Sequence, residues 1–137
     1  MMKIFINSTR KDLELAKDLA RRLKAIGLEA FTEEETVRSE DDWLAPIDRR
    51  LRNSDEVIVL LTDHAIASRR MMSELGTAYG LDKKVIPIMV GVDVDALPPL
   101  LKNLPYIKYD EIEDYLTDLR KRSDAFDKKY TKKVYAD

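Results

Sequence analysis

Short apolar runs recur along the chain. They are separated by longer stretches in which the apolar residues follow helical spacing. The runs are rich in β-branched residues and are bounded by polar turns, a pattern typical of buried strands. The predicted strands cover residues 3–7, 28–31, 57–62, 85–90 and 106–109. Because strands that alternate with helices join by right-handed crossovers, the pattern predicts a parallel sheet.

The stretch between the first two runs predicts an amphipathic helix over about residues 11–26. Its apolar residues share one face at three- and four-residue spacings: Leu13, Ala16, Ala20, Leu23 and Ile26. Gly27 follows directly, and a glycine at this position is expected to end the helix in the left-handed conformation.

Further helices are predicted from near residue 41 to 53, from Ser68 toward the fourth strand, and from about Asp110 onward. The loop over residues 91–103 leaves room for one short helix. The inner face of the last helix is expected to comprise Ile112, Leu116, Leu119 and Phe126.

These elements predict an α/β chain with a flavodoxin-like three-layer fold. The expected sheet has five parallel strands in the order 2-1-3-4-5, with helices on both faces. One domain over residues 1–125 accounts for the core, and the charged segment 126–137 is expected to be the end of the last helix or a frayed tail.

Composition narrows the chemistry that this domain can perform. The 137 residues include no cysteine and one histidine, His64, which excludes disulfides, thiol nucleophiles and multi-histidine metal sites. The formal net charge of -2 gives no electrostatic case for binding nucleic acid, which usually needs a basic face. No apolar window reaches the length of a membrane span or a signal peptide, so a cytoplasmic location with no membrane partner is expected.

Glu74 is the leading candidate for catalysis. It lies six residues after Ser68, near the start of the helix that follows the third strand. Ligands of open α/β sheets bind beside the carboxyl ends of the strands, so this carboxylate is expected beside the crevice. A glutamate early in a helix also interacts favourably with the helix dipole, which is the alternative interpretation.

Four blocks of the chain resemble a TIR (Toll/interleukin-1 receptor) domain of the prokaryotic stand-alone type. The blocks are residues 5–12, residues 27–31 with 41–43, Ser54–Asp55 before the third strand, and Ser68 with Glu74–Leu75. Their order and spacing cover most of the chain, from Lys3 to about Leu119.

The resemblance implies an enzyme that cleaves the nicotinamide–ribose bond of NAD, with Glu74 as the catalytic carboxylate. NAD is then a substrate, and no cofactor or metal is expected. The residues implied in substrate binding are Ser8, Thr9, Arg10, Trp43 and Ser68. Trp43 shares a helical face with Ile47 and Leu51, so a place in the core is its alternative role.

The resemblance also implies self-association and a role in prokaryotic defence or stress signalling. The loop formed by Val37, Arg38, Ser39 and Glu40 is expected to complete the site of a neighbouring copy. A separate sensor or effector protein is a further expected partner.

The chain departs from the family pattern at positions that bear on substrate preference and activity. Ser39 and Glu40 stand where the family usually has Pro-Gly, Arg70 stands where an aromatic residue is common, and Ser8 replaces another aromatic residue. Hydrolysis, cyclisation and transfer to another acceptor all remain open.

Three other functions fit parts of the sequence. Residues 74–79 and 84–86 also resemble nucleoside 2-deoxyribosyltransferases, which attack a nucleoside C1′ with a glutamate. A non-catalytic TIR–TIR interaction module is the second alternative. The third alternative is a receiver domain, which Asp63 and Lys108 would fit. However, this chain has Asn7–Ser8 after the first strand, where a receiver domain has an acidic pair.

Overall fold

The computed structural model describes residues 1–32 and 51–135 and contains one five-stranded sheet. All four strand pairs are parallel and the order is β2-β1-β3-β4-β5, as predicted. The strands are β1 (Lys3–Asn7), β2 (Glu29–Thr32), β3 (Glu56–Leu61), β4 (Lys84–Met89) and β5 (Ile107–Lys108).

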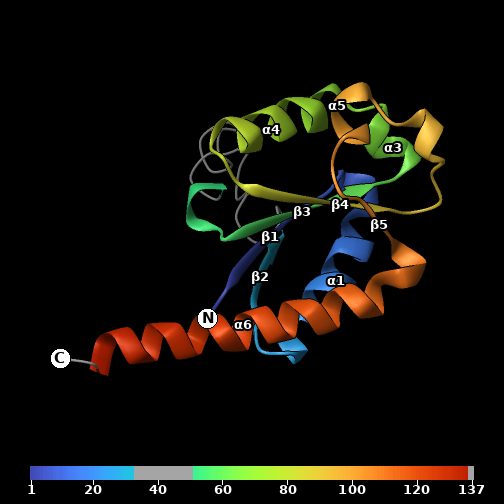
Figure 1. Ribbon diagram of the computed structural model, residues 1–137. Helices are drawn as coiled ribbons and strands as arrows, with labels where there is room; N and C mark the ends of the chain where they lie inside the picture. Colours follow the sequence, from blue (N-terminus) through green and yellow to red (C-terminus); the bar gives the residue numbers. More distant parts are fainter. Residues whose placement is uncertain (33–50, 136–137) are drawn as a thin grey trace.

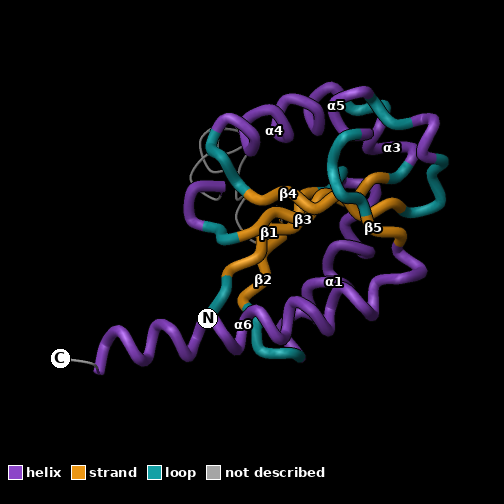
Figure 2. The backbone as a smooth tube through the Cα atoms, in the orientation of Figure 1, coloured by secondary structure: helices purple, strands orange, loops and turns teal. Residues whose placement is uncertain are grey.

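Helices cover both faces of the sheet (Figures 1 and 2). The α-helices that lie wholly within the described residues are α1 (Leu13–Ala25), α3 (Asp63–Ile66), α4 (Arg69–Gly80), α5 (Pro99–Lys102) and α6 (Ile112–Tyr135). Short 3-10 turns occur as η1 (Arg10–Asp12), η4 (Val94–Ala96) and η5 (Tyr109–Glu111). Helices α1 and α6 pack on one face, and α3, α4 and α5 pack on the other. None of the helices in the described ranges is long and apolar enough to cross a bilayer.

The alternation of side chains along β1 separates two apolar layers. Ile4 and Ile6 pack among the residues of α1 and α6, whereas Phe5 packs with the residues of α4 on the opposite face. Every residue of β3 is buried. A central parallel strand is covered on both faces, which explains its continuous apolar sequence.

Gly27 ends α1 as its sequence predicts. Its φ of +92° lies in the region that favours glycine, and its N–H donates to the carbonyl of Lys24. The N–H of Leu28 donates to the carbonyl of Leu23. These two bonds form a Schellman motif, which directs the chain from α1 into β2.

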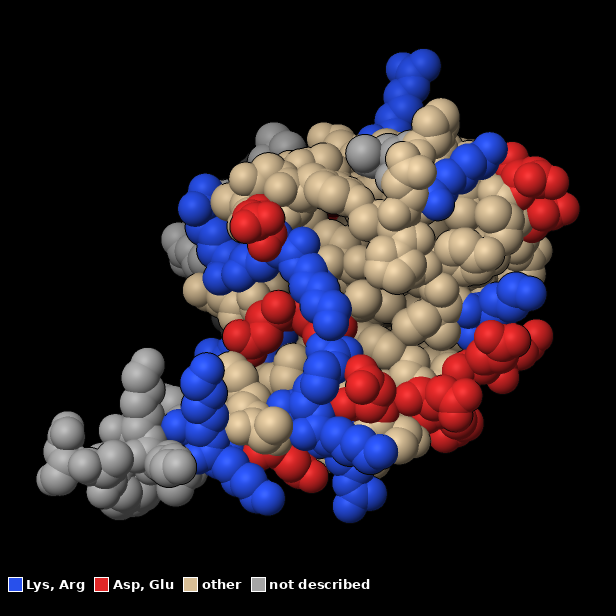
Figure 3. All heavy atoms as spheres, viewed as in Figure 1, with Lys and Arg blue, Asp and Glu red and all other residues tan. Residues whose placement is uncertain are grey.

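Helix α6 corrects one sequence-based prediction, because Phe126 is 40% exposed and does not belong to the inner face. Within residues 112–129 of α6, the buried residues are Ile112, Tyr115, Leu116, Leu119 and Ser123. The helix has 24 residues, so it is about 36 Å long, roughly twice the length of a six-residue strand. Its carboxyl-terminal part therefore extends past the sheet (Figure 1), and the helix continues to Tyr135 through the segment expected as helix end or tail. In Figure 3 acidic and basic side chains interleave along this lower part of the molecule.

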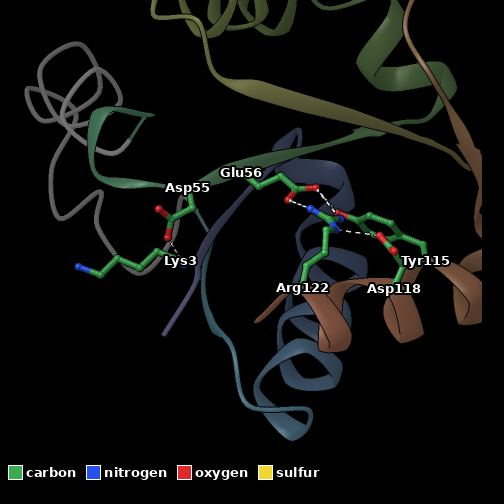
Figure 4. Close-up of polar contacts among 6 residues, drawn as sticks. All are labelled: Lys3, Asp55, Glu56, Tyr115, Asp118 and Arg122. Atoms are coloured by element: carbon green, nitrogen blue, oxygen red, sulfur yellow. Dashed lines mark hydrogen bonds and ion pairs between the residues drawn. The ribbon is translucent and has the colours of Figure 1, made fainter. Parts of the chain in front are cut away.

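A buried carboxylate joins α6 to the amino end of β3 (Figure 4). Glu56 is 1% exposed, accepts hydrogen bonds from Arg122 Nη1 at 2.7 Å and Nη2 at 3.3 Å, and accepts another from Tyr115 Oη at 3.1 Å. Arg122 Nε also donates to Asp118 at 2.7 Å. Burial, and then the charge of Glu56, raise the pKa of Tyr115, while the hydrogen bond to Glu56 raises the pKa of Arg122.

Replacement of Arg122 by Met should lower the free energy of unfolding by about 3 kcal/mol, because it leaves the charge of Glu56 buried without a cation. The double variant Glu56→Gln/Arg122→Met should be more stable than the single variant, since the buried charge is then absent. Urea denaturation measures both, with Asp118→Asn as an exposed control expected to cost under about 1 kcal/mol. A double variant less stable than Arg122→Met would contradict the buried-charge explanation.

Tyr115 should ionise only when the protein unfolds in alkali. Because its pKa is raised above the unfolded value of about 10, it favours the native state below that pH and loses this contribution as pH rises further. Tyrosinate absorbance and circular dichroism, followed together, should show one late ionisation that coincides with unfolding. The Tyr115→Phe variant should lack this late ionisation, and the control Tyr79→Phe, at an exposed tyrosine, should retain it. Ionisation of Tyr115 while the protein is still folded would contradict the raised pKa.

Candidate active site

A pocket of about 360 Å³ lies beside the carboxyl ends of β1 and β3. The segment after β1 supplies Ser8, Thr9, Arg10 and Lys11, and α3 supplies His64. The start of α4 and the residues before it supply Ala67, Ser68, Arg70 and Met71. The charged side chains of this described lining, Arg10, Lys11 and Arg70, are all basic. The pocket lies at the edge of the sheet where open α/β folds bind ligands.

Asp12 connects the two strand ends that form the pocket. Its Oδ2 accepts hydrogen bonds from Thr9 Oγ1 and from Thr62 Oγ1, both at 2.6 Å. Thr62 directly follows β3, and its Oγ1 also accepts from the N–H of Ala65 and caps α3. One carboxylate thus holds the turn after β1 against the end of β3. Sequence reasoning missed this role because Thr62 lies 50 residues from Asp12.

Ser68 sets the position of α4. Its Oγ accepts a hydrogen bond from the N–H of Met71 at 3.2 Å, which makes it the N-cap of the helix. An N-cap satisfies a backbone donor that the first turn cannot pair. Because the helix begins at Arg69, Arg70 reaches the pocket and Glu74 lies one turn further along.

Glu74 is buried although it carries a carboxylate. The residue is 7% exposed, and its Oε1 accepts a hydrogen bond from Arg70 Nε at 2.8 Å. Its Oε2 is buried and has no hydrogen-bond partner among the described residues. An unpaired buried carboxylate oxygen is unfavourable, so Oε2 is a candidate acceptor for a donor outside the described residues, such as a ligand.

Asn7 is a second buried group with an unpaired acceptor, and sequence reasoning did not identify it. It is 1% exposed, and its Oδ1 has no partner among the described residues. Side chains alternate along β1, so Asn7 points to the same face as Phe5, toward the layer that holds α4 and Glu74. Two oxygens that accept hydrogen bonds therefore face this layer near the carboxyl edge of the sheet.

The structure brings together four of the residues expected to bind substrate, since Ser8, Thr9, Arg10 and Ser68 all line the pocket. Glu74 is not part of the lining and connects to it through Arg70. Trp43 and the loop Val37–Arg38–Ser39–Glu40 lie outside the described residues. Within residues 1–32 and 51–135, no group of three or more His, Asp or Glu side chains is arranged to hold a metal ion.

Comparison with protein families matches residues 4–123 to the TIR domain. The chain belongs to the TIR-domain family. A search of curated proteins finds no match for this TIR domain.

Solved structures share the fold at low sequence identity. The TIR domain of the Toll-related receptor TRR-2 from Hydra magnipapillata has a TM-score of 0.69 and 18% identity, over 88% of this chain and 95% of that one. The TIR domains of the activated Roq1 resistosome have a TM-score of 0.59 and 15% identity, over 69% and 61%. The CMP N-glycosidase BcmB of Clostridium botulinum has a TM-score of 0.61 and 20% identity, over 85% and 97%.

Replacement of Asp12 by Ala should destabilise the TIR domain by about 1–3 kcal/mol, because two hydroxyl groups lose a charged acceptor. Thr9→Val should cost much less in the Asp12→Ala background than in the native chain, because its partner is already gone. Chemical denaturation of the four proteins measures this coupling. Asp18→Ala, on the exposed side of α1, is the control, and full additivity of Asp12→Ala and Thr9→Val would contradict the shared interaction.

Proposed function

We propose that this TIR domain cleaves the nicotinamide–ribose bond of NAD, with Glu74 as the catalytic carboxylate. The observation that carries the proposal is the buried Oε2 of Glu74. This oxygen has no hydrogen-bond partner within residues 1–32 and 51–135, and its residue lies one helical turn from a pocket lined by basic side chains. NAD offers phosphates for basic side chains, ribose hydroxyls for unpaired acceptors and a bond that one carboxylate can help to break.

The chemistry requires little beyond a positioned negative charge. Nicotinamide is a cationic group in NAD, so it leaves as a neutral molecule without protonation by an acid. The ribose that remains develops positive charge in an oxocarbenium-like transition state. A carboxylate beside it stabilises that charge and accepts hydrogen bonds from the ribose hydroxyls. We assign this role to Glu74, with Asn7 Oδ1 as a second acceptor.

The pocket residues then bind the remainder of the substrate. Arg10 and Lys11 are assigned to the phosphates, and Ser8, Thr9 and Ser68 to polar contacts with phosphate or ribose. Whether water or another nucleophile reaches C1′ first decides between hydrolysis, cyclisation and transfer. The similarity to a CMP N-glycosidase supports cleavage of an N-glycosidic bond on this fold.

Self-association of the TIR domain is the second part of the proposed function. The similarity to TIR domains of an activated resistosome supports self-association, through which the loop 37–40 of one copy would complete the site of the next. Activity is then expected to rise with protein concentration. We propose a cytoplasmic, prokaryotic role in defence or stress signalling, with a separate sensor or effector as partner.

Incubation of the concentrated protein with NAD tests the proposal, with nicotinamide and ADP-ribose products separated by chromatography. The native chain should release nicotinamide, and Glu74→Gln should lower the rate by on the order of 10²–10³-fold, because the amide keeps the shape of the side chain but not its charge. Glu111→Gln, at an exposed acidic residue, should retain the native rate. Circular dichroism establishes that each variant is folded.

No release of nicotinamide by the native chain, even with crowding agents that favour assembly, would reject NAD cleavage. Base exchange between deoxynucleosides would then support the transferase alternative. Concentration-dependent assembly without either reaction would support a non-catalytic interaction module.

A further inference from the structure

Basic side chains gather at the pocket although the chain as a whole carries a formal net charge of -2. Arg10, Lys11 and Arg70 line it together with His64, and no aspartate or glutamate of residues 1–32 or 51–135 belongs to the lining. On the α6 side of the molecule, by contrast, charges of both signs interleave (Figure 3). A local excess of cations in a concave site raises the local concentration of anionic ligands.

Arg70 is the member of this group that also contacts the proposed catalytic carboxylate. It precedes Glu74 by four residues on α4, so the two side chains lie on the same face of the helix. The side chain of Arg70 is 41% exposed and that of Glu74 is 8% exposed. One guanidinium therefore lies at the boundary between the open pocket and the buried carboxylate.

This contact weakens the carboxylate as a catalyst. A cation 2.8 Å from Oε1 offsets much of the negative charge that Glu74 needs to stabilise a developing positive charge at C1′. A substrate phosphate offers the guanidinium another anionic partner, with oxygens that match its fork of N–H donors. When Arg70 turns to that phosphate, both oxygens of Glu74 become available to the ribose.

We propose that Arg70 determines specificity by coupling recognition of a substrate phosphate to release of the Glu74 carboxylate, which restricts the site to phosphorylated nucleotides. The inference rests on the proposed role of Glu74 and extends it to the substrate class. Arg70 acts through Glu74 and is a positioning residue. It explains why a basic residue functions where the family commonly has an aromatic one.

A comparison of two substrates distinguishes this specificity role of Arg70 from a purely structural role. The substrates share the bond that is cleaved, but only one of them carries phosphate. NAD and nicotinamide riboside both release nicotinamide, and only NAD carries phosphate. The native chain should strongly prefer NAD. Arg70→Gln should lower kcat/KM for NAD on the order of 10- to 100-fold, because a charged contact to phosphate is lost. The same variant should raise kcat/KM for nicotinamide riboside several-fold, because Glu74 is released from its cation.

Arg69→Gln is the matched control, since it removes the same charge from the preceding residue of α4, which is exposed and does not line the pocket. It should leave the ratio of the two kcat/KM values unchanged. A parallel fall for both substrates in Arg70→Gln would overturn the inference, because a merely structural residue behaves in that way. A fall for NAD with no gain for the riboside would overturn the coupling.

A binding measurement separates this inference from the proposed NAD cleavage. Inorganic pyrophosphate should raise the Tm of the native chain and of Arg69→Gln, and the rise should be lost in Arg70→Gln. The native chain could cleave neither nicotinamide substrate while pyrophosphate still raised its Tm and failed to raise that of Arg70→Gln. That result would reject NAD cleavage but support phosphate recognition by Arg70. An equal Tm rise in all three proteins would refute phosphate recognition by Arg70 whether or not NAD is cleaved.

Discussion

Burial of both faces of β3 is the constraint on which the rest of the molecule depends. No residue of this strand is exposed, so its polar chemistry lies at or just beyond its two ends. At the amino end, Glu56 accepts hydrogen bonds from Tyr115 and Arg122 and anchors α6. At the carboxyl end, Thr62 donates to Asp12 and helps to form the pocket. The same strand thus supports a stabilising cluster at one end and the candidate active site at the other.

Among the described residues, Glu56 and Glu74 are buried carboxylates that differ in how completely their hydrogen bonds are satisfied. Both oxygens of Glu56 have partners, and an arginine balances its charge. Glu74 has a similar degree of burial, but one of its oxygens has no partner among the described residues. A completed network such as the first stabilises the fold, whereas the unpaired oxygen of Glu74 is consistent with the proposed role in binding a substrate.

Much of the fold was predictable because its signals are local. The bounds of β1 to β5 agree with the apolar pattern to within about one residue, and those of α1 to within about two, because burial imposes the period of each element. Helix α3 was not predicted, and most of the predicted helix over residues 41–53 lies outside the described residues. The cap at Ser68 and the helix end at Gly27 also follow from neighbouring residues. The exposure of Phe126 was not predictable, because helical period continues along α6 after the sheet beneath it has ended.

The candidate site, too, has features that the sequence predicted and features that only the tertiary structure revealed. The sequence by itself determined the strand order, the positions of Ser8, Thr9, Arg10 and Ser68 at strand and helix ends, and the four-residue spacing of Arg70 and Glu74. Only the tertiary structure showed that Asp12 joins β1 to β3, that Asn7 faces the layer of Glu74, and that Arg122 neutralises Glu56 from 66 residues away. Periodicity encodes which residues are buried, but it does not encode which distant side chains meet, because that depends on how whole elements pack.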